Sequence, residues 1–243
     1  MERERVFLIT GAARGIGRYI AKSFADAGTK LAVVDIRPLD TVARELKERE
    51  AETLAITADV TDEAAVRAMM QQVASHYGRI DVLVNNAAIP THNAWEPHWA
   101  RIRDMEKSFW DRILDTNLGG TFLCTKHVLP YMEQQRSGHI LNLHGGGNPT
   151  NVGSAAYVTS KDAIRTFTQY VAEEEREFGI FIGCLGPGGI IATEDAPEEV
   201  RQRLPGVEIV GTRFVLAAQA PMELSGQLLR MEEGRLIGDS AHG

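Results

Sequence analysis

The chain has 243 residues, of which 44% are hydrophobic and 24% are charged, and it carries a formal net charge of −7. This length suits one large domain, and the composition is that of a globular protein able to bury a sizeable core. A net negative charge gives no basic footprint for a nucleic acid. No apolar run approaches the roughly 20 residues of a membrane-spanning helix, and the N-terminus is too short for a signal peptide. We therefore expect a single domain over residues 1–243, located in the cytoplasm, with no nucleic-acid or membrane partner.

The cysteines and histidines indicate no metal site. Cys124 and Cys184 are the two cysteines, they lie far apart in apolar segments, and they are best interpreted as packed free thiols in a reducing compartment. His92 and His98 lie close in sequence, but no further ligand clusters with them.

A phosphate-binding turn is predicted near the N-terminus. The apolar run Val6–Ile9 predicts a strand, and Thr10-Gly-Ala-Ala-Arg-Gly-Ile-Gly17 follows it. Apolar residues at helical spacing then predict a helix that ends at Gly28. Glycines let the backbone approach a pyrophosphate, and the helix N-terminus offers free N–H groups. The candidate cofactor residues of this turn are Gly11, Arg14, Gly15, Ile16 and Gly17.

A second predicted strand, Leu31–Val34, ends in Asp35. A carboxylate at this point can accept hydrogen bonds from the ribose hydroxyls of an adenosine and would repel a 2′-phosphate. Arg14 and Arg37 are the counter-argument, since either guanidinium could pair with a 2′-phosphate. The balance favours NAD over NADP.

The next elements repeat the alternation of helix and strand. We expect a helix over 41–51, a strand over 53–57, a helix over 63–77 and a strand over 80–84. Asp59 and Val60 follow the third strand, where the carboxylate could hold an adenine amino group and the valine could pack against the ring. The alternative for Asp59 is a helix cap, a role that Thr61 or Asp62 would fill equally well.

The turn after the fourth predicted strand contains Asn85-Asn-Ala-Ala88. Its side-chain amides can close backbone hydrogen bonds between neighbouring strands beside the cofactor, which makes Asn86 and Ala87 candidate cofactor residues. Strands and helices that alternate in this way predict an α/β protein with a doubly wound parallel sheet, helices on both faces and a ligand beyond the carboxyl ends of the strands.

The middle of the chain is less regular. The segment 89–103 contains His92, Trp95, His98 and Trp99, whose side chains could border a substrate pocket or anchor a loop. A helical pattern from Phe109 to Met132 is interrupted by Asn117-Leu-Gly-Gly120. Asparagine and glycine are unfavourable in a helix interior, so a bend that exposes the backbone to water or a ligand is predicted, with a packing role for the glycines as the alternative.

The segment 137–162 carries the candidate chemistry. It predicts a strand over 139–143, a glycine-rich break over 145–147 and a helix with Tyr157 and Lys161. Residues four apart lie on the same face of a helix. We expect the ammonium of Lys161 to lower the pKa of Tyr157 from roughly 10 toward neutrality, which would suit the phenol to proton transfer.

Taken in order, these motifs resemble the short-chain dehydrogenase/reductase family over essentially the whole chain. The matching positions are Thr10-Gly-x-x-x-Gly-Ile-Gly17, Asp59, Asn85-Asn-Ala, Asn117, Tyr157-x-x-x-Lys161 and Pro187-Gly188. The resemblance implies a Rossmann-like fold and hydride transfer between a nicotinamide cofactor and a small-molecule alcohol or carbonyl. It also implies a homodimer or homotetramer.

The resemblance assigns roles to single residues. Tyr157 resembles the catalytic acid/base, Lys161 the lysine that binds the nicotinamide ribose, and Asn117 the asparagine whose backbone holds a water of the proton relay. Further candidate cofactor residues implied in this way are Asp35, Pro187, Gly188 and Thr193.

The chain departs from the family at the catalytic serine. The family has a serine thirteen residues before the tyrosine, and this position is His144; a gap of one residue would place Gly145 there instead. Three interpretations are open: His144 donates a hydrogen bond in place of the serine, Ser154 or Thr150 substitutes for it, or the site is impaired and the protein acts through NAD binding or assembly. We take the first as the leading hypothesis, with Asn117, His144, Tyr157 and Lys161 as the catalytic residues.

Overall fold

The computed structural model describes residues 5–25, 29–90, 101–146, 152–189, 191–194, 197–203 and 207–239. His92, Trp95, His98, Trp99 and Thr150, discussed above, lie outside these ranges. The described residues form one eight-stranded sheet in the order β3-β2-β1-β4-β5-β6-β7-β8, in which all neighbours are parallel except β7 and β8. The strands are β1 (Val6–Thr10), β2 (Lys30–Asp35), β3 (Glu52–Thr57), β4 (Val82–Asn85), β5 (Gly138–Leu143), β6 (Ile180–Leu185), β7 (Leu228–Glu232) and β8 (Arg235–Asp239).

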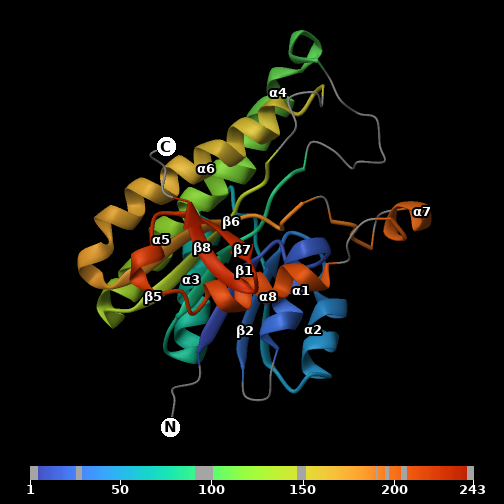
Figure 1. The fold of residues 1–243 in the computed structure, drawn as a ribbon. Coiled ribbons are helices and arrows are strands. Elements are labelled where there is room, and N and C mark those ends of the chain that lie inside the picture. Colours follow the sequence, from blue (N-terminus) through green and yellow to red (C-terminus); the bar gives the residue numbers. More distant parts are fainter. Residues whose placement is uncertain are drawn as a thin grey trace.

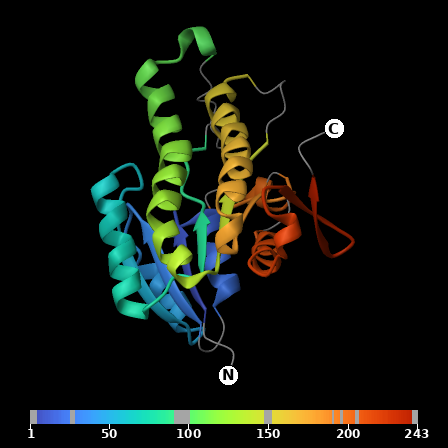
Figure 2. The same ribbon diagram turned by 90° about the vertical axis from the view of Figure 1, so that its left-hand side faces the viewer.

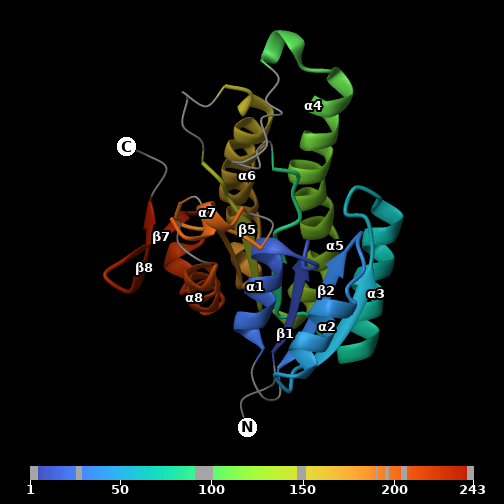
Figure 3. The ribbon, with the colours of Figure 1, turned by 90° about the vertical axis from the view of Figure 1, so that its right-hand side faces the viewer.

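Helices cover both faces of the sheet, as the sequence predicts (Figures 1 and 3). One face carries α1 (Gly15–Phe24), α2 (Asp40–Lys47) and α8 (Glu208–Ala217), whose Ile20, Val42 and Phe214 belong to one buried cluster. The other face carries α3 (Glu63–Tyr77), α5 (Gly120–Gln135) and α6 (Ala155–Glu174), whose Val66, Val128 and Val171 belong to a second cluster. The α/β fold with a doubly wound, Rossmann-like sheet is therefore confirmed.

Shorter elements complete the described chain. They are α4 (Lys107–Leu114), the π-helical turn η2 (Asp115–Gly119), α7 (Glu198–Arg201) and the 3₁₀ turns Ile102–Asp104, Arg176–Phe178 and Met222–Leu224. The long helices α5 and α6 run side by side and extend beyond the sheet (Figures 1 and 2), with the rings of Phe122 and Phe167 6.5 Å apart. No helix in the described ranges is long and apolar enough to cross a membrane.

Two helix boundaries differ from the prediction. The helix α1 ends at Phe24, four residues before Gly28, and α2 ends at Lys47 because Glu50 has a φ of 64°, a left-handed conformation that cannot continue a helix. The boundaries of α3 agree with the predicted range of 63–77. Its cap is Asp62, whose carboxylate accepts hydrogen bonds from the N–H groups of Ala64 and Ala65.

The predicted irregularity at Asn117 is a π-helical turn, in which the helix from Lys107 to Gln135 locally widens. Gly120 follows directly, and a Cβ there would lie 2.6 Å from the Cγ2 of Val60. The glycine thus allows the loop after β3 to pack closely against α5.

Asparagine side chains join the strands at the centre of the sheet. The amide of Asn86 donates to the carbonyl oxygens of Thr10 and Gly11 at 2.8 and 3.0 Å, which connects β4 to β1 as predicted. The amide of Asn85 donates to Asn142 at 2.9 Å, and Asn142 donates to Thr168 of α6 at 2.9 Å. These bonds hold α6 in a fixed position relative to the carboxyl ends of β4 and β5.

Candidate functional site

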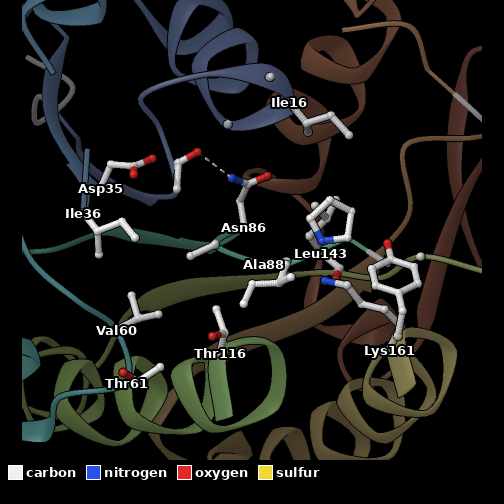
Figure 4. A pocket seen from close by; sticks show the side chains of 18 of the residues that line it. Ile16, Asp35, Ile36, Val60, Thr61, Asn86, Ala88, Thr116, Leu143 and Lys161 are labelled. Carbon is white, nitrogen blue, oxygen red and sulfur yellow. Dashed lines mark hydrogen bonds between the residues drawn. The ribbon is translucent and has the colours of Figure 1, made fainter. Parts of the chain in front are cut away.

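A cavity of about 1480 Å³ lies along the carboxyl edge of the parallel strands (Figure 4). Each of six strands is followed directly by a residue or short turn that lines it: Gly11, Ile36, Ala58, Asn86, Gly145 and Gly186. Asp35 and Ile36 lie toward one side of Figure 4 and Lys161 toward the other, with Asn86 between them. The cavity therefore has the length and position that an extended dinucleotide needs at a doubly wound sheet.

The glycines of the first turn are required by close backbone packing. Gly11 has a φ of +66° and Gly15 a φ of +56°, the left-handed region that favours glycine. A Cβ at Gly17 would lie 2.2 Å from the carbonyl oxygen of Gly11 and 2.4 Å from the side-chain nitrogen of Asn86. The side chain of the N-cap residue Arg14 does not cap α1, and the first-turn residues Gly15, Ile16 and Gly17 line the cavity, where N–H groups of a helix N-terminus can bind an anion. These residues fit a pyrophosphate group.

Asp35 lies at the end of the cavity expected to hold the adenosine. Its carboxylate accepts hydrogen bonds from the backbone N–H groups of Ala13 and Arg37, each at 3.0 Å. Partial burial raises the pKa of Asp35, and the hydrogen bond from Ala13 opposes that rise. Arg14 and Arg37 also line the cavity. The cavity therefore contains both the carboxylate that would repel a 2′-phosphate and the guanidinium groups that could pair with one.

Asp59 and Val60 line the cavity after β3. The Asp59 carboxylate accepts hydrogen bonds from the N–H and the hydroxyl of Thr61, at 2.9 and 2.8 Å, and does not cap α3. Val60 is buried and Ala87 half-buried, and Pro187, Gly188 and Thr193 also line the cavity. The predicted cofactor residues on the five loops are thus brought together in one cavity.

Tyr157 and Lys161 share one face of α6, and the Lys161 Nζ lies 5.8 Å from the centre of the Tyr157 ring. Lys161 is only 1% exposed, and its Nζ donates to the carbonyl oxygen of Leu143 at 2.8 Å. Burial lowers the pKa of Lys161 to about 8 and raises the pKa of Tyr157 to about 12. The prediction of a lowered tyrosine pKa is therefore wrong for this arrangement, because burial disfavours the charged phenolate.

Asn117 lies in the π-helical turn and is completely buried. Its side-chain oxygen accepts from the N–H of Ile89 at 2.8 Å, and its amide donates to the hydroxyl of Ser160 at 2.9 Å. Ser160 in turn donates to the carbonyl oxygen of Tyr157 at 2.6 Å. Asn117 thus connects the loop after β4 to the helix that carries Tyr157. Ser160 was not predicted, although its place three residues after Tyr157 puts it on the same helix face.

His144 points away from the place that the sequence count assigned to it. Its Nε2 lies 3.4 Å from the Asp162 carboxylate, and His144 is not among the residues that line the cavity. Burial lowers the pKa of His144, which disfavours the imidazolium. This geometry does not support an imidazole that polarises a substrate carbonyl beside Tyr157.

Gly145, which lines the cavity, occupies the position that faces Tyr157. A Cβ built on Gly145 would lie 2.2 Å from the Tyr157 hydroxyl oxygen. The count of thirteen residues back from Tyr157 assumes a fixed number of residues between the catalytic position and the tyrosine. A count of twelve places that position at Gly145 and not at His144. A shift of one residue near the end of a strand also sends the side chain to the other side, which explains the error.

Ser154, the described one of the two substitute donors considered above, is buried just before α6. It is not among the residues that line the cavity, so the structure does not bring it to the Tyr157 hydroxyl. Within the described ranges no group of three or more histidine, cysteine, aspartate or glutamate residues could hold a metal ion. Cys124 and Cys184 are buried free thiols, as predicted.

A dinucleotide cradle at the carboxyl edge of a Rossmann-like sheet, with a tyrosine and a lysine one helical turn apart at its far end, defines a class of nicotinamide-dependent oxidoreductases. The family model for short chain dehydrogenases matches residues 5–203 of this chain. The chain therefore belongs to the short-chain dehydrogenase/reductase family, whose members are NAD(P)-dependent oxidoreductases.

Three relatives show how widely the family resemblance extends. A 3-oxoacyl-[acyl-carrier-protein] reductase FabG of Staphylococcus aureus is 33% identical over 250 residues, covering 96% of this chain and 99% of the relative. A (2S)-[(R)-hydroxy(phenyl)methyl]succinyl-CoA dehydrogenase subunit BbsD of Thauera aromatica is 32% identical and covers 97% and 98%. A secoisolariciresinol dehydrogenase of Forsythia intermedia is 35% identical over 189 residues, covering 76% of this chain and 66% of the relative.

The buried ammonium generates a prediction about stability and pH. The pKa of Lys161 falls from 10.5 to about 8 on folding, so between these values the unfolded chain binds more protons and stability rises with pH. This pKa difference lowers the free energy of unfolding by roughly 3 kcal/mol below pH 8, and the cost disappears above pH 10.5. Urea unfolding at pH 7 and pH 10 should show the parent gaining stability relative to Lys161→Met as the pH rises.

The matched control is Lys107→Met, because the Lys107 side chain is 85% exposed and burial does not disfavour its ammonium. The stability difference between the parent and this variant should not change with pH. An equal stability difference between parent and Lys161→Met at both pH values would contradict the buried ammonium.

Proposed function

We propose that this protein transfers a hydride between NAD(H) and a small secondary alcohol or ketone. The observation that carries the proposal is the single cavity that joins the glycine turn and Asp35 to Tyr157 and Lys161. A cofactor with its adenosine at Asp35 and its pyrophosphate at the first turn would reach Tyr157 with its nicotinamide end.

NAD would supply the hydride acceptor or donor, held by residues on the loops after five strands. Lys161 would hold the nicotinamide ribose, and Tyr157 would transfer the proton. Burial raises the pKa of Tyr157 to about 12, so the neutral phenol is the form held at neutral pH, and this form donates a proton to a developing alkoxide. Asn117, in the widened helical turn, would support the relay by holding the helix that carries Tyr157 through its hydrogen bond to Ser160.

The preference for NAD over NADP is carried by Asp35. Its carboxylate is held at the adenosine end of the cavity by two backbone N–H groups, and its negative charge would lie against a 2′-phosphate. A homodimeric or homotetrameric state and a cytoplasmic location remain predictions.

Calorimetry should show NAD⁺ binding at least about tenfold more tightly than NADP⁺, a difference of roughly 1.4 kcal/mol. Asp35→Asn keeps the size of the side chain and removes its charge, so it should reduce the preference for NAD⁺. Tighter binding of NADP⁺ than of NAD⁺ by the parent would refute the role of Asp35.

Tyr157→Phe should abolish turnover, because the proton transfer loses its donor, and should leave the melting temperature within a few degrees of the parent. The measurement is NADH-linked absorbance on an alcohol or ketone that the parent turns over. Tyr170→Phe is the matched control, since Tyr170 lies on the same helix with 70% of its surface exposed. Parent-like turnover by Tyr157→Phe would show that another group transfers the proton.

A second function is favoured by Gly145. The position that faces the Tyr157 hydroxyl offers no side-chain donor, so the site is impaired if a hydroxyl is needed there. The protein would then act through NAD binding or assembly.

Serine substitutions at the two neighbouring positions separate these functions. Gly145→Ser supplies a hydroxyl beside Tyr157. The Tyr157 ring must shift slightly in this variant, because the new Cβ would lie 2.2 Å from the Tyr157 hydroxyl oxygen. One such donor contributes about 10²–10³ in turnover, so an impaired site should gain at least tenfold in kcat from Gly145→Ser. If His144→Ser lowers kcat, the imidazole is used; if His144→Ser raises kcat more than Gly145→Ser does, the assignment of position 145 is wrong.

A further inference from the structure

A carboxylate of this chain accepts a hydrogen bond from one of the backbone donors predicted for the pyrophosphate, the N–H of Gly15. The Oε1 of Glu194 accepts a hydrogen bond from the N–H of Gly15 at 2.9 Å and lies 3.4 Å from the Nη1 of Arg18. Gly15 is the first residue of α1 and belongs to the glycine turn. Glu194 comes from the segment after β6, 179 residues further along the chain. Sequence analysis did not single it out, and its only signal is an acidic residue directly after Thr193.

The carboxylate satisfies the same requirement that a phosphate would. The first turn of α1 has no acidic side chain of its own and no side-chain cap at Arg14. Its free N–H groups and the positive end of the helix dipole attract an anion. Glu194 supplies that anion, and the neighbouring Thr193 lies close to the same turn, with its Cγ2 3.6 Å from a Cβ built on Gly15.

The second oxygen of this carboxylate is poorly accommodated. The Oε2 of Glu194 is buried and has no hydrogen-bond partner among the described residues. A buried carboxylate oxygen without a partner costs free energy, because it has lost its water and gained no donor. Glu194 is therefore held by one good hydrogen bond and one long ion pair, an arrangement that a pyrophosphate with more anionic oxygens can replace.

Arg18 would keep a partner after such a replacement. Its guanidinium also donates to both carboxylate oxygens of Glu45 on α2, with its Nε 2.8 Å from the Oε2 of Glu45. Loss of the 3.4 Å contact between its Nη1 and Glu194 would therefore leave the guanidinium paired.

We propose that Glu194 is an internal competitor for the cofactor: its carboxylate takes the Gly15 N–H that a pyrophosphate would use, and it is displaced with the segment 191–194 when NAD binds. This inference rests on the proposed function, because it assumes that the pyrophosphate binds at the first turn of α1. Since Thr193 adjoins Glu194 and lines the cavity, displacement of the carboxylate would also move a residue of the cavity wall. Cofactor binding and the position of this wall are thereby coupled.

Calorimetric titration of Glu194→Ala and Glu194→Gln with NAD⁺ tests the competition. Both variants should bind NAD⁺ more tightly, roughly tenfold for alanine, which removes the carboxylate, and about threefold for glutamine, which keeps the hydrogen bond and loses the charge. Binding of ADP should tighten in the same way, and binding of adenosine, which has no phosphate, should stay unchanged.

The matched control is Glu198→Gln, which removes one carboxylate from the exposed helix α7 a few residues further along. It should leave NAD⁺ affinity within about twofold of the parent. A second measurement is thermal unfolding: Glu194→Ala should gain a larger increase in melting temperature from saturating NAD⁺ than the parent does, because ligand stabilisation follows affinity.

Unchanged or weaker NAD⁺ binding by both Glu194 variants would overturn the inference, as would equal tightening by Glu198→Gln or by adenosine. If neither the parent nor any variant binds NAD⁺ or NADP⁺, the proposed function itself fails. The two failures are therefore distinguishable.

Discussion

The site depends on the reversal of strand order between β1 and β4. The chain builds β1, β2 and β3 outward in one direction and then returns to place β4 on the other side of β1. The loops after β1 and β4 therefore diverge at their carboxyl ends, and a crevice opens between them. The amide of Asn86 bridges this point by donating to the carbonyl oxygens of Thr10 and Gly11. Without this amide, the carbonyl oxygens of the buried Thr10 and the half-buried Gly11 would each lose a hydrogen-bond donor.

The far end of the cavity depends on the way α6 is held. A hydrogen bond from Asn142 to Thr168 connects α6 to β5, and one from Asn117 to Ser160 connects it to the π-helical turn. Lys161 donates a third hydrogen bond to the carbonyl oxygen of Leu143. Each of these contacts uses a buried polar group, so a displaced helix would leave several of them unsatisfied. The same burial sets the protonation of the site, because it disfavours both the phenolate of Tyr157 and the ammonium of Lys161.

Two carboxylates bonded to the glycine turn, those of Asp35 and Glu194, would act differently on a dinucleotide. Asp35 would accept hydrogen bonds from the ribose and exclude a 2′-phosphate, which selects the cofactor. Glu194 lies on the phosphate donors themselves and would oppose either cofactor to a similar extent. Selectivity and overall affinity would thus depend on different carboxylates, which accept hydrogen bonds from Ala13 and Gly15 of the same glycine turn.

The sequence by itself determined the alternation of strands and helices, the parallel sheet and the phosphate-binding turn. These follow from local patterns: apolar runs, glycines at a strand-to-helix junction and polar residues at strand ends, all read within short windows. The helix 63–77 is predicted to the residue because its cap and its terminal glycine are local signals.

Only the tertiary structure decided the features that depend on contacts between distant segments. The pKa of Tyr157 rises because burial disfavours the phenolate, and spacing along a helix contains no information about burial. Gly145 and not His144 faces the Tyr157 hydroxyl, because the length of the loop before α6 decides which side chain turns toward the cavity. Glu194 reaches Gly15 across 179 residues, a contact that exists because β1 and β6 end at the same edge of one sheet.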